Sequence, residues 1–259
     1  MTEIASATTL GDLLAYRRRR RFVGRASEVE LFRVALESAE PQFLLLYLHG
    51  PPGIGKTTLL DVYAEIATEA GASVVRLDGR DLVSSPQAVL QGLEVPEVLD
   101  GESTIAGLSR DRRTVIMFDT YERLASLDEW IRTWFVPRLP STALTVLAGR
   151  AAPDSAWRAD AAWRELLRVV SLRNLSPADS RQYLQACGVN PLRVDQLVGL
   201  AHGHPLGLSL LADVEMRGGE AAPDPLTPDL VGTHCYAGLS KLSPVSSTDV
   251  PWRCVRSQG

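Results

Sequence analysis

The stretch from Gly50 to Thr58 carries the clearest chemistry in the chain. It reads GPPGIGKTT and lies between an apolar run and an apolar helical pattern. Its glycines let the backbone wrap with N–H groups pointing inward, and the following helix adds the positive end of its dipole. Lys56 supplies a point charge for β- and γ-phosphates, and the Thr57 hydroxyl suits Mg²⁺. The stretch therefore predicts a nucleoside triphosphate site. Its predicted binding residues are Gly50, Pro51, Pro52, Gly53, Ile54, Gly55, Lys56, Thr57 and Thr58.

A lone aspartate completes the predicted metal site. Asp119 ends the run TVIMFD, whose apolar residues predict a buried strand. In sheets of parallel strands, ligands bind beyond the carboxyl ends of the strands. A phosphate loop also needs an acid on the magnesium side. We therefore expect Thr57 and Asp119 to hold Mg²⁺ together.

The group that would activate water for hydrolysis is less well defined. Thr120 follows Asp119 directly, and the first carboxylate after it is Glu122. Glu122 either polarises the attacking water or forms a surface pair with Arg123 or Arg158. Without a well-placed base, turnover is slow and the protein acts as a nucleotide switch.

An arginine follows the fourth predicted strand. Arg150 stands after an apolar run that ends in Gly149, so it faces the same crevice as the phosphates or is a solvated residue in a turn. In the first case it contacts the γ-phosphate through a charge-assisted hydrogen bond. The predicted catalytic set is Lys56, Asp119, Glu122 and Arg150.

Two other segments are candidates for contacts with the base and ribose. Val23, Gly24 and Arg25 precede the first core helix, and the glycine lets backbone approach a flat ring. His204 and Pro205 open the last helix, where proline stiffens the turn and presents an apolar edge. His204 either lies near the nucleotide or caps its helix. The histidines of this turn lack cysteines or acids at ligand spacing, which argues against zinc.

Composition narrows the protein class. The 259 residues are 45% hydrophobic and carry a net charge of −4, which gives no general attraction to nucleic acid or anionic membranes. No apolar run approaches the ~20 residues that span a bilayer, and the N-terminus does not resemble a secretory signal. Cys187, Cys235 and Cys254 form no metal or disulfide pattern, which fits the cytoplasm.

Four regions follow one another along the chain. Residues 1–21 read as a flexible basic leader ending in five arginines, which are a solvated tail or bind nucleic acid or an acidic partner. Residues 22–175 form the predicted ATPase core, and 176–219 a small helical lid. Residues 220–259 are rich in proline and lack periodicity, so we expect irregular or disordered chain and a truncated or frame-shifted end.

The core alternates strand and helix patterns. Short apolar runs separated by helices predict an α/β fold, a parallel sheet with helices on both faces. The expected strands are Phe43–His49, Ser73–Asp78, Thr114–Phe118, Leu144–Ala148 and Val169–Leu172. The expected helices are Glu28–Ser38 with Ser27 as cap, Thr57–Ala70, Pro86–Leu93, Ser176–Cys187, Pro191–Ala201 and Pro205–Met216.

The motifs, taken in order, resemble a known family. FVGR, GPPGIGKTTLL, TVIMFDTYERL, LTVLAGR, VVSLRNLSPADSRQYL and GHPLGLSLLAD run across residues 21–216. Together they resemble the STAND branch of AAA+-type P-loop ATPases, which includes the NB-ARC-like signalling ATPases. The resemblance implies strand order 5-1-4-3-2, a helical lid, and ATP or ADP between core and lid. By position, Val23 and Arg25 match the adenine-side motif, Gly50 to Thr58 Walker A, Asp119 Walker B, Arg150 the first sensor, and Pro205 the lid.

Two departures from the family pattern shape the functional prediction. Walker B lacks the adjacent second acid, and the expected C-terminal effector or sensor region is missing or scrambled after 220. The leading prediction is a regulatory ATPase, a slow ATP-dependent switch that self-associates or acts through that missing region. A DNA-associated AAA+-type ATPase, such as an initiator or transposition helper, is the alternative, and a small-molecule kinase is third.

Overall fold

A parallel sheet of five strands forms the centre of the computed structural model, which describes residues 9–93, 105, 108 and 113–217. The strands are β1 (Leu45–His49), β2 (Ser73–Asp78), β3 (Thr114–Asp119), β4 (Ala143–Gly149) and β5 (Leu167–Ser171). Their order is β2-β3-β4-β1-β5, and every neighbouring pair is parallel. This is the predicted order read from the opposite edge, and the P-loop NTPase fold is confirmed.

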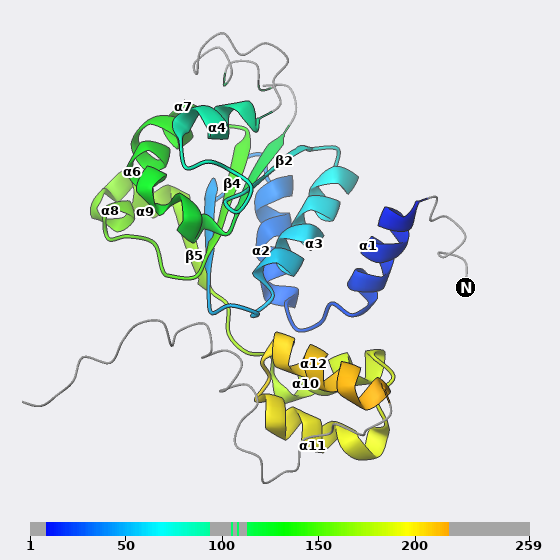
Figure 1. Cartoon of the computed structure of the whole chain (residues 1–259). Helices are drawn as coiled ribbons and strands as arrows, with labels where there is room; N and C mark the ends of the chain where they lie inside the picture. Colours follow the sequence, from blue (N-terminus) through cyan, green and yellow to red (C-terminus); the bar gives the residue numbers. More distant parts are fainter. Residues whose placement is uncertain (1–8, 94–104, 106–107, 109–112, 218–259) are drawn as a thin grey trace, which may run out of the picture. The chain divides into compact units, whose positions relative to one another are not determined.

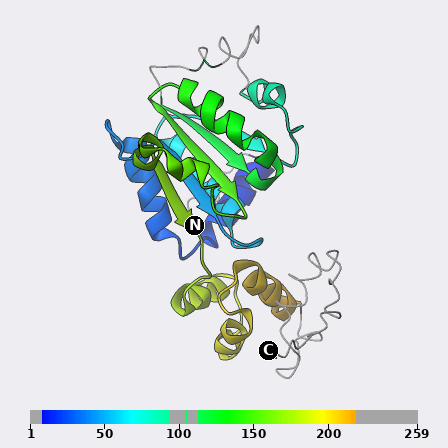
Figure 2. The same cartoon turned by 90° about the vertical axis from the view of Figure 1, so that its left-hand side faces the viewer.

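Helices cover both faces of the sheet (Figures 1 and 2). One face packs against α2 (Ala26–Glu37) and α3 (Lys56–Glu69). The other face packs against a series of shorter helices. These are α4 (Pro86–Gln91), the 3₁₀ helix η2 (Tyr121–Leu127), α6 (Asp128–Trp130), the π-helix η3 (Ile131–Phe135), α7 (Val136–Arg138), α8 (Ala156–Ala159) and α9 (Ala161–Leu166).

Strand β1 shows why the strands read as continuous apolar runs. Leu46 and Leu48 belong to the core under α2 and α3, whereas Leu45 and Tyr47 belong to the core on the other face. Successive side chains of a strand point to opposite faces, so a sheet covered on both faces needs apolar residues at every position.

The predicted lid helices are present. α10 (Pro177–Ala186), α11 (Pro191–Ala201) and α12 (Pro205–Met216) pack around an apolar cluster of their own. Each has proline in its first turn and a side-chain cap before it, from Ser176, Asn190 and His204. These local signals explain why the helix bounds could be predicted. The boundary between core and lid at 175 stays a prediction.

The basic leader differs from the expectation of a flexible segment. Residues Leu10–Arg20 form helix α1, and Arg19 pairs with Glu65 and Glu69 of α3. The prediction considered solvent, nucleic acid or a separate acidic partner for the arginines, whereas α3 of the same chain carries acids along the side that faces α1. Residues 1–8 and the predicted tail 220–259, with Cys235 and Cys254, lie outside the described residues.

Some local predictions were wrong. Ser27 does not cap α2, because the helix already begins at Ala26 and the Ser27 hydroxyl donates to Glu28 instead. The helices η2 to α9 were not predicted, because most are too short for a clear period. Among the described helices, none is long and apolar enough to cross a membrane.

Candidate functional site

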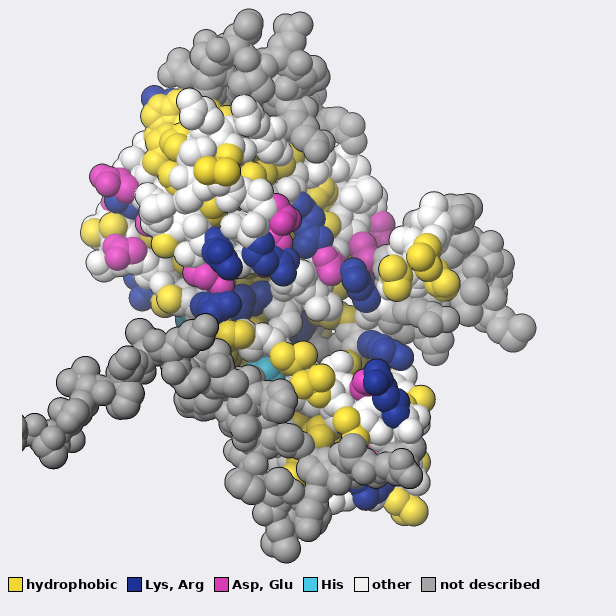
Figure 3. All heavy atoms as spheres, viewed as in Figure 1, with side chains coloured by type: hydrophobic (Ala, Val, Ile, Leu, Met, Phe, Trp, Pro, Cys, Tyr) yellow, Lys and Arg dark blue, Asp and Glu magenta, His cyan; other side chains and the backbone are white. Residues whose placement is uncertain are grey.

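The strand register gathers the predicted site residues at one edge of the sheet. His49 of β1, which precedes the phosphate loop, pairs with Gly149 of β4. Asp119 of β3 pairs with Asp78 of β2. The phosphate loop, Asp119 and the segment after Gly149 therefore follow the carboxyl ends of adjacent strands, where parallel sheets bind ligands. Figure 3 shows basic and acidic side chains interspersed on this side of the core.

The phosphate loop has the backbone that anion binding requires. Gly53 and Gly55 have φ of 75° and 96°, which other residues adopt only with strain. A Cβ on Gly50 would lie 2.9 Å from the Leu172 carbonyl oxygen. Gly55 precedes α3, and no side chain caps the start of that helix. Its first N–H groups are therefore available to an anion.

Lys56 is held by the loop that it belongs to. Its Nζ donates to the carbonyl oxygens of Gly50 at 2.7 Å and Pro51 at 3.0 Å. Burial lowers the pKa of Lys56, and Arg150 lowers it further, while Glu122 and Asp119 oppose this shift. The ammonium thus lies within electrostatic reach of all three predicted catalytic partners, and a phosphate would replace carbonyl contacts with a stronger charged one.

Asp119 has the features of a metal-side acid. Only 5% of the residue is exposed. One carboxylate oxygen, Oδ1, accepts the Thr120 backbone N–H at 2.8 Å, while Oδ2 is buried without a hydrogen-bond partner. A buried acceptor without a partner is costly, and a hydrated cation would satisfy it. Thr57 is exposed at the start of α3, so the donor set fits Mg²⁺ with phosphate and water as its other ligands.

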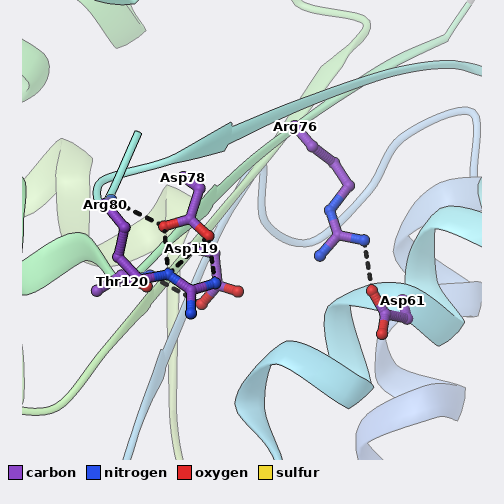
Figure 4. A network of polar contacts seen from close by, with 6 residues as sticks. All are labelled: Asp61, Arg76, Asp78, Arg80, Asp119 and Thr120. Carbon is purple, nitrogen blue, oxygen red and sulfur yellow. Dashed lines mark hydrogen bonds and ion pairs between the residues drawn. The ribbon is translucent and has the colours of Figure 1, made fainter. Parts of the chain in front are cut away.

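Sequence reasoning missed a polar cluster beside Asp119. Figure 4 shows Asp78, Arg80, Asp119 and Thr120 together at the ends of β2 and β3. Arg80 Nε lies 3.0 Å from both carboxylate oxygens of Asp78, and this hydrogen bonding lowers the Asp78 pKa to about 2. Asp78 is the last residue of the predicted strand Ser73–Asp78, which the predicted strand order places beside Thr114–Phe118. Its position at this edge of the sheet could therefore have been predicted.

The turn after β3 is strained. Thr120 has φ 52°, which is rare for a β-branched residue. Its carbonyl oxygen would lie 2.7 Å from a Cβ on Gly79, and the Gly79 N–H donates to the Asp119 carbonyl at 3.0 Å. The turns after β2 and β3 therefore pack directly on each other. Strain of this kind is often found at functional sites.

Glu122 and Arg150 are paired with each other. Arg150 Nε lies 2.7 Å from Glu122 Oε1. The pairing partner of Glu122 is thus Arg150 and not Arg123 or Arg158, and Arg150 is not simply solvated in a turn. Glu122 Oε2 is buried without a hydrogen-bond partner, while 62% of the Arg150 side chain is exposed.

Arg25 is used to hold the fold together. Its guanidinium donates to the carbonyl oxygens of Ile54 at 3.0 Å and Arg173 at 2.7 Å, and pairs with Glu28 at 3.4 Å. Only 7% of the residue is exposed. The side chain ties the phosphate loop to α2 and to the segment after β5. An adenine contact from this region would therefore use backbone or the neighbouring Val23.

His204 caps α12 and contacts the phosphate loop. Its Nδ1 accepts the Gly207 N–H at 3.3 Å, so the proton is on Nε2, which donates to the Pro52 carbonyl at 3.1 Å. Next to it, the Leu206 N–H donates to the Gly53 carbonyl at 3.2 Å. Of the two alternatives predicted for His204, the structure shows the helix cap. Because Nδ1 accepts the capping hydrogen bond, Nε2 carries the proton and can donate it to the loop.

A pocket of about 420 Å³ extends from the phosphate loop. Its size is within the ~300–1,000 Å³ of small-molecule sites. The predicted residues that line it are Val23, Arg25, Pro205 and the loop from Gly53 to Thr58. Sequence reasoning did not predict its other walls, which include Arg18, Arg21, Leu175 and Tyr183. The other predicted site residues do not line this pocket: Gly24, Gly50, Pro51, Pro52, Asp119, Glu122, Arg150 and His204.

Comparison with known proteins agrees with this geometry. A family model described as an AAA ATPase domain matches residues 21–100. No curated protein sequence matches the chain significantly.

Several solved structures have a similar fold. A chain of the E. coli MS115-1 complex of HORMA, CdnC and Trip13 is 13% identical with a TM-score of 0.51, covering 90% of this chain and 93% of that one. A proline-to-glycine mutant of RuvB from Thermotoga maritima is 17% identical with a TM-score of 0.51, covering 85% and 71%. Replication initiator DnaA, bound to AMPPCP and single-stranded DNA, is 14% identical with a TM-score of 0.51, covering 76% and 62%.

The coverage of other RuvB structures limits which properties of RuvB can be assigned to this chain. This chain covers 61% of the length of a RuvB chain that it matches. At such identities the likeness shows the fold alone. The chain therefore has the P-loop NTPase fold, and its residues 21–100 are similar to the AAA ATPase domain.

Proposed function

We propose that this protein binds ATP with Mg²⁺, hydrolyses it slowly, and acts as a nucleotide-dependent switch. The observation that carries the proposal is the unpartnered Oδ2 of Asp119, buried at the sheet edge within electrostatic reach of Lys56. A buried carboxylate oxygen beside a phosphate loop is a position that a hydrated cation would fill. The match of residues 21–100 to an AAA ATPase domain agrees with it.

ATP would occupy the pocket that starts at the phosphate loop. The N–H groups at the start of α3 and the Lys56 ammonium would bind the β- and γ-phosphates. The base would lie toward Val23, Leu175 and Pro205, which are apolar residues that line the pocket. When bound through Thr57 and Asp119, magnesium would neutralise charge on the phosphates.

Slow hydrolysis follows from the position of the acids. The residue after Asp119 is Thr120, so the nearest available base is Glu122. Its Oε1 is held by Arg150 at 2.7 Å, so this oxygen is occupied and is not positioned to accept a proton from an attacking water. A γ-phosphate would compete for Arg150 and release Glu122. Hydrolysis would thus be coupled to γ-phosphate sensing.

The same pair supports a switch. ATP and ADP differ at the γ-phosphate, so only groups that feel it can give the two nucleotides different effects on conformation. Lys56 and Arg150 are such groups. The lid contacts the loop through His204–Pro52 and Leu206–Gly53, so a change in the loop would reach the lid. In the STAND-like hypothesis, this change controls self-association or an effector region.

A DNA-associated ATPase is the second candidate. The exposed arginines at the end of α1 favour it, whereas the net charge of −4 does not. Affinity for duplex DNA that falls steeply with salt would support this candidate. Affinity that stays weak at low salt would argue against it.

The first experiment measures ATP binding by calorimetry in magnesium. Lys56→Ala should weaken ATP binding at least about tenfold, because charge-assisted contacts are worth roughly 1.5–3 kcal/mol. Arg33→Ala on the exposed side of α2 is the control and should bind like the parent. Equal affinity of Lys56→Ala and the parent would refute the nucleotide site.

The second experiment measures single-turnover hydrolysis of pre-bound ATP. The parent rate should fall below the ~1 s⁻¹ lower end of ordinary enzymes. Glu122→Gln should lower the rate further, because the amide cannot accept a proton, and should not weaken ATP binding, because it removes the competitor for Arg150. A parent rate of many per second would exclude the slow switch. An unchanged rate in Glu122→Gln would remove Glu122 from the reaction.

A further inference from the structure

Two arginines of the basic run lie at the pocket. Arg18 and Arg21 line it, together with Val23, Lys56 and Tyr183. The sequence alone predicted that this run is a solvated tail or binds nucleic acid or an acidic partner. A tail would have no fixed position relative to a ligand, whereas these two residues form part of a wall.

Helix α1 is held beside the pocket by α3. Arg19 Nη1 lies 3.0 Å from Glu69 Oε1 and 3.7 Å from Glu65 Oε2. Arg18 has a longer contact, 3.9 Å, with Asp61, which also pairs with Arg76. The Arg18 side chain is 65% exposed. Arg19 therefore has the shorter contacts with α3, while Arg18 keeps most of its donors available to a ligand.

Arg21 reaches the pocket from the turn that ends α1. Its backbone N–H donates to the Arg18 carbonyl at 3.1 Å, and the Phe22 N–H donates to the Arg19 carbonyl at 3.1 Å. This turn carries the chain directly into Val23. Arg21 is also close enough to Tyr183 of α10 for its charge to counter the burial that raises the pKa of that phenol. Arg21 and Tyr183 thus line the same pocket.

Four basic residues line the pocket, and they make different contacts. Arg25 donates to two backbone carbonyls and pairs with Glu28, so its guanidinium is not available to a phosphate. Lys56 lies at the start of α3, where the β- and γ-phosphates would bind. The apolar walls suit the base. Arg18 and Arg21 remain for the anionic group between base and β-phosphate, which in a nucleotide is the α-phosphate.

We propose that Arg18 and Arg21 are nucleotide-binding residues that contact the α-phosphate and so contribute to the binding of AMP, ADP and ATP alike. The proposal rests on the proposed function, because it needs a nucleotide in the pocket. It gives the basic run a role that does not depend on DNA. Guanidinium groups suit this role, since they form two parallel hydrogen bonds with phosphate oxygens.

The test compares the double variant Arg18→Gln/Arg21→Gln with the parent by calorimetry. AMP, ADP and ATP should each bind about tenfold more weakly to the variant, since a charged contact is lost from all three. Adenosine, measured by competition with a fluorescent nucleotide, should bind the variant and the parent equally. Arg33→Gln, an exposed arginine of α2 outside the pocket, should match the parent for every ligand. Arg18→Lys/Arg21→Lys should recover part of the affinity, because lysine keeps the charge but not the two parallel hydrogen bonds.

Two outcomes would overturn the proposal. One is unchanged affinity of the glutamine variant for all three nucleotides. The other is an equal loss for adenosine, which would mean that the arginines only shape the pocket. Lys56→Ala keeps this test separate from the proposed function. If Lys56→Ala weakens ATP binding and the double variant does not, the nucleotide site stands and only the α-phosphate contact fails. If the parent binds no nucleotide, the proposed function itself fails.

Discussion

The proposed base side and the proposed γ-phosphate side of the candidate site use their polar groups in opposite ways. On the base side, Arg25 and His204 are almost fully buried, and both bond to backbone of the phosphate loop. On the γ-phosphate side, Asp119 and Glu122 each keep a buried oxygen without a hydrogen-bond partner.

This difference separates groups that stabilise the fold from groups that await a ligand. Leaving a buried polar atom unpartnered costs about 1–3 kcal/mol unless water or an ion satisfies it, so these two oxygens are available to a ligand that enters the site. Substitutions on the base side should therefore change stability first. Substitutions on the γ-phosphate side should change nucleotide chemistry with little effect on stability.

The largest effect on stability is expected at Arg25. Arg25→Ala leaves Glu28 and the carbonyls of Ile54 and Arg173 without their partner, which should lower the free energy of unfolding by about 3 kcal/mol. Thermal unfolding should show a melting temperature lower by ~6–12 °C. Arg33→Ala is the exposed control. If both variants have the melting temperature of the parent, Arg25 does not stabilise the fold. The contrast between the two sides of the site then fails.

A smaller effect, of a different kind, is expected at Asp119. Asp119→Asn keeps the size of the side chain and loses the charge that faces magnesium. ATP affinity should fall about tenfold in magnesium and much less in EDTA, while the melting temperature stays at or above that of the parent. Calorimetry in both buffers measures this. Identical magnesium dependence in variant and parent would exclude Asp119 from the metal site.

His204 should show an effect of about 1 kcal/mol on stability. His204→Ala removes the cap of α12 and the Pro52 contact, whereas His204→Asn can restore the cap but is too short to reach the loop. Urea unfolding should rank the parent above His204→Asn and His204→Ala lowest. Equal stability of the two variants would show that the cap contributes nothing measurable.

The smallest effect is a pH dependence from Asp78. Its pKa lies at about 2 in the fold, against an ordinary value of 3.8, because Arg80 stabilises the charged form. A depressed carboxyl pKa adds stability above the unfolded value, and this contribution disappears as the pH falls from about 4 to about 2. The gain is small because Arg80 is largely exposed. In this range, Asp78→Asn should lose less stability than the parent on acidification. Parallel curves of unfolding free energy against pH for variant and parent would show that the Asp78–Arg80 pair does not contribute to stability.

The sequence by itself determined the sheet, the phosphate loop and the three lid helices. These features depend on neighbours in the chain: strand β3 is an unbroken apolar run, Gly53 and Gly55 set their own backbone, and Ser176 caps the helix that follows it. The strand order came from the family resemblance and was confirmed. Asp119 was found because it ends a strand, and strand ends of a parallel sheet share one edge.

Only the tertiary structure decided which side chains meet. Arg150 pairs with Glu122 and Arg25 bonds to Arg173, and these partners are distant in sequence. Whether an arginine run is solvated or lines a pocket depends on the acids that face it, and those of α3 come into reach only when the helices pack. Local propensities act over a few residues, whereas charge pairing and burial are set by the arrangement of whole elements.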